Sequence, residues 1–169
     1  MSVAAINIAD ENMKTVPDHV RREQTQTLQE LRSSVCFCPH GINERPFYIE
    51  IGLHDHRLIL TFSAQPIMPL KTEVEPANEN AYLNSFVLAL KPYRRIIQDY
   101  FLMIESYQKA RISASADKLE AIDMARRGLH NEGAELLMDR LYGKIELDFD
   151  TARRLFTLIC TLTRQQAVM

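Results

Sequence analysis

The sequence of 169 residues has no apolar run near the roughly twenty residues that a membrane-spanning helix needs. Its start has no signal-peptide pattern, so we expect a cytoplasmic protein that does not bind membranes. Cysteine is also scarce. There are three cysteines, an odd number, which in a cytoplasmic protein indicates reduced thiols rather than a disulfide framework.

The short motifs that mark common catalytic sites are absent too. The sequence contains no glycine-rich phosphate loop, no GxSxG elbow and no HExxH zinc motif. Tyrosine and phenylalanine are not interleaved with basic residues, and 20 basic against 22 acidic residues give a net charge of −2. Proteins that neutralise nucleic-acid phosphates are usually basic, so nucleic acid is not an expected partner.

Possible metal ligands come close together in Cys36, Cys38 and His40, and His54 and His56 lie at the tip of the predicted hairpin. Structural zinc sites usually have CxxC or HxxxH pairs at wider spacing. Only Cys160 is left to complete a cysteine site, and it belongs to the apolar side of the last predicted helix. We therefore expect no metal and no cofactor, and no neighbouring base marks Cys38 as a nucleophile.

The length predicts a single domain over residues 1–169 with a genuine hydrophobic core. The composition, 46% hydrophobic and 25% charged, is typical of a soluble globular protein. Residues 64–84 contain three prolines among acidic and amide side chains, which predicts a long loop.

The N-terminal half reads mainly as strands. Residues 47–53 and 57–62 alternate in polarity and are joined by a short HDH segment, which predicts an antiparallel hairpin. Shorter strands are expected at 2–9 and 85–90. Between them, a mostly polar surface helix is expected from Pro17 to about Val35.

The C-terminal half predicts three consecutive helices. The first begins at Pro92, the second at Ser115 or Asp117 and ends at Gly143, and Asp150 is the expected N-cap of the third. A short connection or strand is expected at 145–147. Strands followed by helices indicate an α+β fold, a small antiparallel sheet covered by these helices and the N-terminal one.

The stretch 119–160 has the strongest helical periodicity. Its first part places one face of apolar residues at spacings of three and four, and we expect Leu129 there and Phe156 in the next helix to be core residues. Gly128 weakens a continuous helix, so a break there, with Asn131 capping a second helix, is an alternative.

Three blocks resemble a known family. PYRRIIQDYF (92–101), IDMARRGLHNEGAELL (122–137) and DFDTARRLFTLIC (148–160) are similar to blocks of the uncharacterised bacterial protein family UPF0262. The resemblance implies a bacterial cytoplasmic protein. It brings no known activity, cofactor or catalytic residue.

Paired arginines recur in these blocks, at 94–95, 126–127 and 153–154. The first and last pairs fall in the first turns of helices, where the helix dipole disfavours cations and a bound anion would offset the cost. Ion pairs within each helix, such as Arg95 with Asp99, explain the same residues.

Polar residues cluster in the middle block, at His130, Asn131 and Glu132. Successive helical residues point about 100° apart, so these three cannot converge on one substrate. A guanidinium near an apolar face needs a partner, so we expect Arg126 to bond a carboxylate of another segment, Asp148 or Asp150. The full candidate site for an anion or a partner comprises Arg94, Arg95, Arg126, Arg127, His130, Asn131, Glu132, Asp148, Asp150, Arg153 and Arg154.

Two functional hypotheses follow. The first is a binding or regulatory module that presents the surface of helices 92–110 and 120–142 to an unknown protein partner. The alternative is an enzyme or sensor for a small anionic or phosphorylated metabolite, with arginines supplying charge, His130 a proton shuttle and Asp148 or Asp150 a base. A pocket lined by all three blocks favours the metabolite, and a flat apolar patch favours the protein partner.

Overall fold

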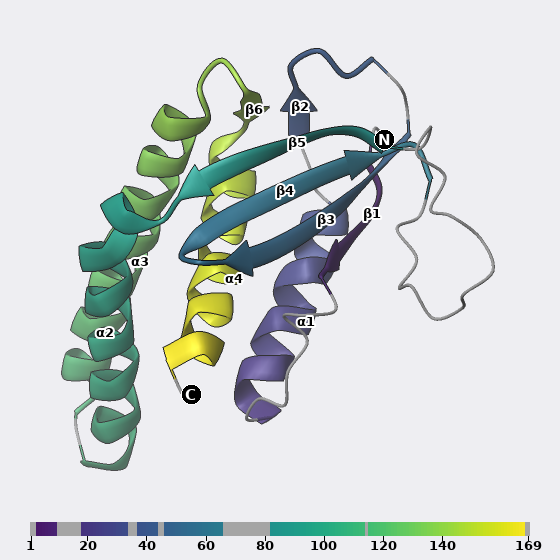
Figure 1. Cartoon of the computed structure of the whole chain (residues 1–169). Coiled ribbons are helices and arrows are strands. Elements are labelled where there is room, and N and C mark those ends of the chain that lie inside the picture. Colours follow the sequence, from purple (N-terminus) through teal and green to yellow (C-terminus); the bar gives the residue numbers. More distant parts are fainter. Residues whose placement is uncertain are drawn as a thin grey trace.

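A computed structural model describes residues 3–9, 18–33, 37–43, 46–65, 82–113 and 115–167 (Figure 1). Strands dominate its first half and helices its second. The elements in chain order are β1 Val3–Ile8, α1 Asp18–Ser33, β2 Phe37–Pro39, β3 Phe47–His54, β4 Arg57–Ser63, β5 Tyr82–Ala89, the 3₁₀ helix η3 Lys91–Tyr93, α2 Arg94–Ser113, α3 Ala116–Leu141, β6 Ile145–Leu147 and α4 Phe149–Ala167. The α+β class is therefore confirmed.

The main sheet has the strand order β1-β3-β4-β5, and a second pair joins β2 to β6. The predicted β3–β4 hairpin is present, and its turn residues Asp55 and His56 have φ of 48° and 59°, as a type I′ turn requires. The sheet is mixed rather than purely antiparallel, because β1 runs parallel to β3. A parallel pair needs a long crossover, and α1 lies in that connection.

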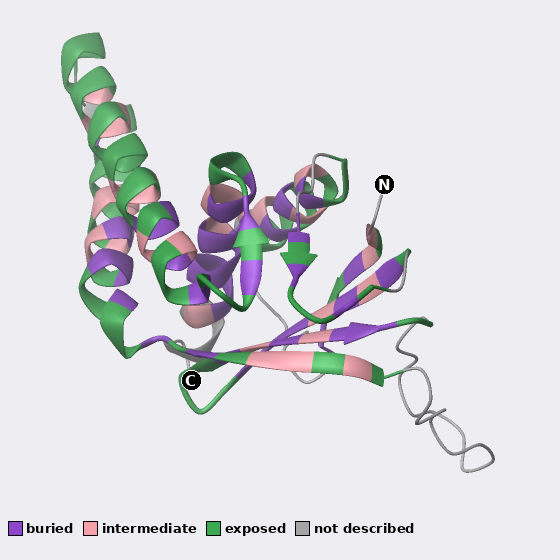
Figure 2. Cartoon of the chain, turned by 90° about the horizontal axis from the view of Figure 1, so that it is seen from above, coloured by how far each residue is buried: buried purple, intermediate pink, exposed green. Residues whose placement is uncertain are grey.

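The helices gather on one side of the main sheet (Figures 1 and 2). Alternation along β3 and β4 gives this side its apolar surface, since paired residues such as Ile49 and Phe62, or Ile51 and Leu60, point the same way. These side chains form one core with Tyr93 and the apolar stripe of α4. No described helix is long and apolar enough to cross a membrane.

The second predicted C-terminal helix is one continuous helix, α3, which passes through Gly128 without a break. It packs beside α2, and both helices extend past the sheet as an exposed arm (Figure 2). Only the later part of α3 is buried in the core, around Gly133, Ala134 and Leu137. Leu129, predicted to be core, is half-buried at its margin, whereas Phe156 is fully buried as expected.

Gly133 is required by the contact between α3 and α4. A Cβ atom at this position would lie 2.5 Å from ring carbon Cδ2 of Phe156, far inside van der Waals contact. The missing side chain therefore lets the Phe156 ring pack directly against the backbone of α3.

The N-cap of α4 is Asp148, not Asp150 as predicted. The backbone N–H of Thr151 donates to Oδ1 of Asp148 at 3.0 Å, the usual N3 contact of a capping side chain. The helix begins one residue after this aspartate, at Phe149, so Asp150 lies within the first turn and does not cap the helix.

The N-terminal helix is more deeply buried than its polar sequence predicts. In α1, Val20, Gln24, Thr27 and Leu31 are buried, and the helix contacts α4 and β1. Most of the predicted 64–84 loop, residues 66–81, lies outside the described residues, and Tyr82–Asn84 belong to β5.

Candidate functional site

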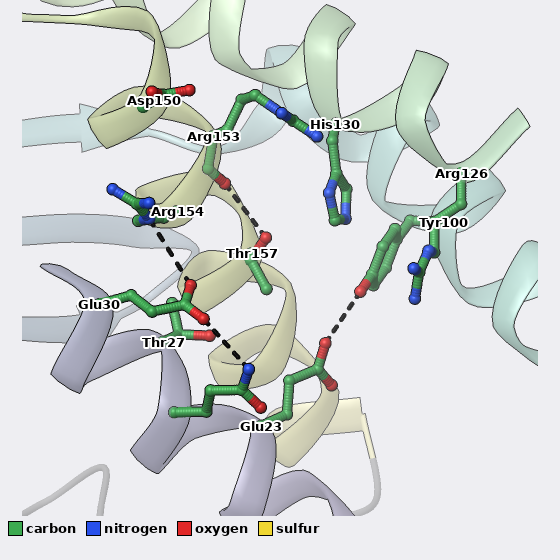
Figure 3. A pocket seen from close by; sticks show the side chains of 11 residues that line it. Glu23, Thr27, Glu30, Tyr100, Arg126, His130, Asp150, Arg153, Arg154 and Thr157 are labelled. Atoms are coloured by element: carbon green, nitrogen blue, oxygen red, sulfur yellow. Dashed lines mark hydrogen bonds and ion pairs between the residues drawn. The ribbon is translucent and has the colours of Figure 1, made fainter. Parts of the chain in front are cut away.

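A cavity of about 410 Å³ lies between α1 and the helices that follow the sheet (Figure 3). Its volume is in the range of small-ligand sites. All three sequence blocks contribute to it, and so does α1. The lining residues are Glu23, Gln26, Thr27 and Glu30 from α1, Tyr100 from α2, Arg126 and His130 from α3, and Asp150, Arg153, Arg154 and Thr157 from α4.

The α4 wall follows from the amphipathic pattern of that helix. Its cavity residues are spaced at i, i+3, i+4 and i+7, which places them on one helical face. The opposite stripe, which includes Leu155, Phe156 and Ile159, is fully buried in the core. Burial of this stripe fixes the rotation of α4, so Arg153 and Arg154 must face the cavity.

His130 lies at the inner end of the cavity, between two aromatic rings. It stacks on Tyr100 with ring centroids 5.1 Å apart and meets the edge of Phe156 at 6.1 Å. Burial lowers the pKa of His130 to about 4, and the positive charges of Arg126 and Arg153 contribute to this decrease. The imidazole is therefore neutral at physiological pH.

Two buried nitrogen atoms at this site lack a hydrogen-bond partner within the described part of the chain. They are Nε2 of His130 and Nε of Arg153. Leaving such a group unpaired costs about 1–3 kcal/mol, and more when it is charged. Both side chains line the cavity, so a molecule bound there is one source of the missing partners.

The α1 wall is acidic where it faces these donors. Tyr100 donates its hydroxyl hydrogen bond to Oε1 of Glu23 at 3.1 Å, and Nε of Arg154 approaches Oε2 of Glu30 to 3.6 Å. Gln26 adds a hydrogen bond to the other Glu30 oxygen at 3.1 Å. The α1 wall thus carries two carboxylates, whereas the α3 and α4 walls carry three guanidiniums and one carboxylate, Asp150.

The hydroxyl and thiol groups near the cavity are poorly suited to nucleophilic chemistry. Burial raises the pKa of the Tyr100 hydroxyl, with a further increase from Glu23, so Tyr100 stays a hydrogen-bond donor. Thr157 donates to the backbone oxygen of Arg153 at 3.1 Å. Cys160 is completely buried, which raises its pKa well above the usual value.

The structure divides the predicted site residues into two sets. Arg126, His130, Asp150, Arg153 and Arg154 line the cavity. The other six lie outside it, namely Arg94, Arg95, Arg127, Asn131, Glu132 and Asp148.

Several residues outside the cavity have structural partners instead. Arg95 pairs with Asp99 at 3.1 Å, as the intrahelical alternative predicts, and forms a short ion pair with Glu132 of α3. Arg127 pairs with Asp123 at 3.1 Å within α3. The Arg95–Glu132 pair joins α2 to α3, and the other two pairs lie within one helix; together they account for these charges without a ligand.

The predicted partner of Arg126 is wrong. Its Nη2 bonds Oδ1 of Asp123 on the same helix at 2.9 Å, rather than Asp148 or Asp150 on α4. The Arg126 side chain is 48% exposed, so the guanidinium lies at the rim of the cavity. Its position near the apolar face of the helix predicted a buried, desolvated guanidinium, and this prediction is wrong.

Sequence reasoning missed the α1 wall completely. Its cavity residues Glu23, Gln26, Thr27 and Glu30 follow the same i, i+3, i+4, i+7 spacing as those of α4. That polar face is visible in the sequence, but nothing in it indicates that another helix packs opposite.

The cysteine–histidine stretch shows no metal-binding arrangement in the part that is described. Cys38 is exposed on β2, His40 approaches Glu146 to 3.5 Å, and Cys36 lies outside the described residues. Among the described residues, no three His, Cys, Asp or Glu side chains come close enough to hold a metal ion. A metal-free stretch remains a prediction.

Comparison with known proteins gives one consistent result. The model of the uncharacterised protein family UPF0262 matches residues 1–165. A UPF0262 protein of Chelativorans sp. (strain BNC1) is 45% identical over 154 residues, 90% of this chain and 88% of its own. Relatives from Rhizobium etli (strain CFN 42) and Rhodopseudomonas palustris (strain TIE-1) are 44% and 37% identical, covering 88% and 95% of this chain and 86% and 90% of theirs. No solved structure gives a significant match.

Proposed function

This chain belongs to the uncharacterised bacterial family UPF0262, and on the geometry of its cavity we propose that it is a cytoplasmic binding protein for a small anionic metabolite. The single observation behind the proposal is the pair of unpartnered buried nitrogens, Nε of Arg153 and Nε2 of His130, at one cavity. A carboxylate or phosphate oxygen accepts from both, and guanidinium is the preferred partner for either group.

The location of the cavity supports binding rather than a purely structural role for its charges. The lining comes from four helices, so a ligand there would connect α1 to α3 and α4. Sensors often work in this way, because a ligand that bridges elements stabilises one arrangement of them. An exposed free thiol at Cys38 fits a reducing compartment such as the cytoplasm.

The proposal is tested by calorimetric titration of inorganic phosphate and of succinate into the purified protein. We expect binding that weakens as sodium chloride is added, because chloride competes for the guanidiniums and screens them. Arg153→Gln should lower the affinity by roughly 10- to 100-fold, the usual value of a charged hydrogen bond.

The matched control is Arg94→Gln, which removes an exposed arginine outside the cavity and should leave binding unchanged. Equal loss in both variants would indicate a nonspecific charge effect. If neither of these anions nor any other small probe with a carboxylate or phosphate group binds the natural sequence, the proposal is overturned.

A second candidate function, binding of a protein partner, rests on the exposed arm. Leu102, Ile112 and Met124 are 62%, 89% and 65% exposed on α2 and α3. Isolated apolar side chains are common on surfaces, so this observation is the weaker one. If the arm binds another copy of the chain, sedimentation analysis should show self-association that Ile112→Glu abolishes.

A further inference from the structure

We infer that the ligand of the cavity is a small zwitterion, with a carboxylate or phosphate toward Arg153 and His130 and an ammonium group toward Glu23. This inference rests on the proposed function and specifies its ligand class. The carrying observation is that the α1 wall is acidic and the α3 and α4 walls, Asp150 included, are on balance basic, while no ion pair with a described residue is formed by Glu23.

The charged groups of the two walls approach each other at one end of the cavity. There Arg154 of α4 comes within 3.6 Å of Glu30 of α1. Among the described residues, no ion pair joins Glu23 to Arg126 or to Arg153. Glu23 instead accepts a hydrogen bond from the neutral hydroxyl of Tyr100, at one of its two carboxylate oxygens.

Tyr100 brings the two unsatisfied regions close together. Its ring stacks on His130, and its hydroxyl bonds Glu23, so the carboxylate and the unpartnered imidazole nitrogen flank the same aromatic side chain (Figure 3). A ligand within hydrogen-bond reach of Nε2 of His130 therefore lies near Glu23 as well.

A purely anionic ligand fits this arrangement poorly. Its charge would satisfy Arg153 but would face the Glu23 carboxylate in a partly desolvated cavity, where like charges repel more strongly than in water. A purely cationic ligand would leave Arg153 unpaired. An ammonium group near Glu23 together with an anionic group near Arg153 compensates both walls.

The cavity volume agrees with a molecule of this size. The volume of about 410 Å³ lies near the lower end of the range of small-ligand sites, so the cavity suits a small metabolite. Amino acids and small aminoalkyl phosphates are metabolites of this kind.

The test compares matched probes that differ only in the ammonium group, titrated into the purified full chain. The pairs are phosphoethanolamine with ethyl phosphate, and glutamate with glutarate. We expect the zwitterionic member of at least one pair to bind tenfold or more tightly than its partner.

Glu23→Gln provides the sharper measurement, because it should change the two kinds of probe in opposite directions. It should weaken phosphoethanolamine several-fold, since the ammonium group loses its carboxylate, and tighten ethyl phosphate and inorganic phosphate, since a repelling charge is removed. The control Glu135→Gln removes an exposed carboxylate outside the cavity and should shift neither. Circular dichroism and melting temperature confirm that each variant is folded.

The outcomes separate the two proposals. The zwitterion inference is wrong, while anion binding stands, if two results are obtained together. Ethyl phosphate or glutarate binds as tightly as its amino counterpart, and Glu23→Gln changes the affinities of both members of the pair in the same direction. If no probe binds the natural sequence, both the inference and the proposed function are wrong.

Discussion

The two halves of α3 have the same apolar periodicity but different surroundings. From Gly133 to Leu141 the helix has its buried residues, and α3 contacts α4 and β6 as well as α2. From Ala116 to Gly128 no residue is buried, since Leu119 and Ile122 are half-buried and Met124 is exposed. The difference teaches that periodicity identifies a helical face, whereas burial depends on whether another element of the fold reaches it.

The largest difference in stability is expected between two truncations, one of a buried side chain that packs on the later half of α3 and one of an exposed side chain on the arm. Phe156→Ala removes a fully buried ring that packs against Gly133, Tyr100 and His130, and should cost about 3–5 kcal/mol of unfolding free energy. Leu102→Ala, on the exposed arm, should change stability by less than about 0.5 kcal/mol. Denaturant unfolding of both variants provides the measurement. Similar losses would mean that the arm is buried in solution.

The two glycines of α3 test the same comparison through smaller effects. Substitution by alanine should raise the free energy of unfolding at one glycine and lower it at the other. At Gly128 nothing lies within 4 Å of the position that a Cβ atom would take, so Gly128→Ala should stabilise by about 0.5–1 kcal/mol through helix propensity. At Gly133 the new methyl overlaps the Phe156 ring, and overpacking should make Gly133→Ala destabilising by about 1–2 kcal/mol. Stabilisation by both substitutions would contradict the close α3–α4 contact.

The same division explains how far the sequence predicts the fold. Local signals are sufficient for the β3–β4 hairpin, for α2 and for a continuous α3 as one of two alternatives, because strand alternation and helical periodicity depend on neighbouring residues. The parallel pairing of β1 is not predictable in this way. It depends on where α1 returns the chain, which is a tertiary property.

The candidate site shows the same limit. The α4 residues Arg153 and Arg154 are identifiable because they lie opposite an obvious apolar stripe. The acidic residues of α1 are not, since only the packing of α1 on α4 brings them to the cavity. Sequence alone also does not separate Asp148 from Asp150. Both lie at the start of α4, and the exact helix boundary decides that Asp148 caps the helix and Asp150 lines the cavity.

A smaller effect should appear in the pH dependence of stability. The pKa of His130 is about 4 in the fold against 6.5 for the free side chain, so the folded state favours the neutral form. The resulting stability is fully present above pH 6.5 and is lost as the pH falls from 6.5 to 4. The groups facing the imidazole are Tyr100 from α2, Arg126 and Asp123 from α3, and Arg153 from α4.

Because His130 is only partly buried, solvent screening reduces the expected loss to about 1–2 kcal/mol. Carboxylates titrate over the same interval, so the measurement is the difference between the natural sequence and His130→Gln in denaturant unfolding at pH 7 and pH 5. The natural sequence should lose more stability than the variant. Equal slopes would mean that His130 is accessible to solvent.

The smallest effect on stability is expected at Arg126, at the boundary between the two halves. Its partner Asp123 lies on the same helix, and the guanidinium is about half exposed. Intrahelical pairs of this kind contribute a few tenths of a kcal/mol, so Arg126→Ala should cost less than about 1 kcal/mol. A desolvated pair with α4 would instead cost several kcal/mol when broken. Unfolding and phosphate titration on this one variant distinguish the roles: a small loss of stability with clearly weaker binding places Arg126 at the ligand, whereas a loss of several kcal/mol would show that the guanidinium holds the helices together.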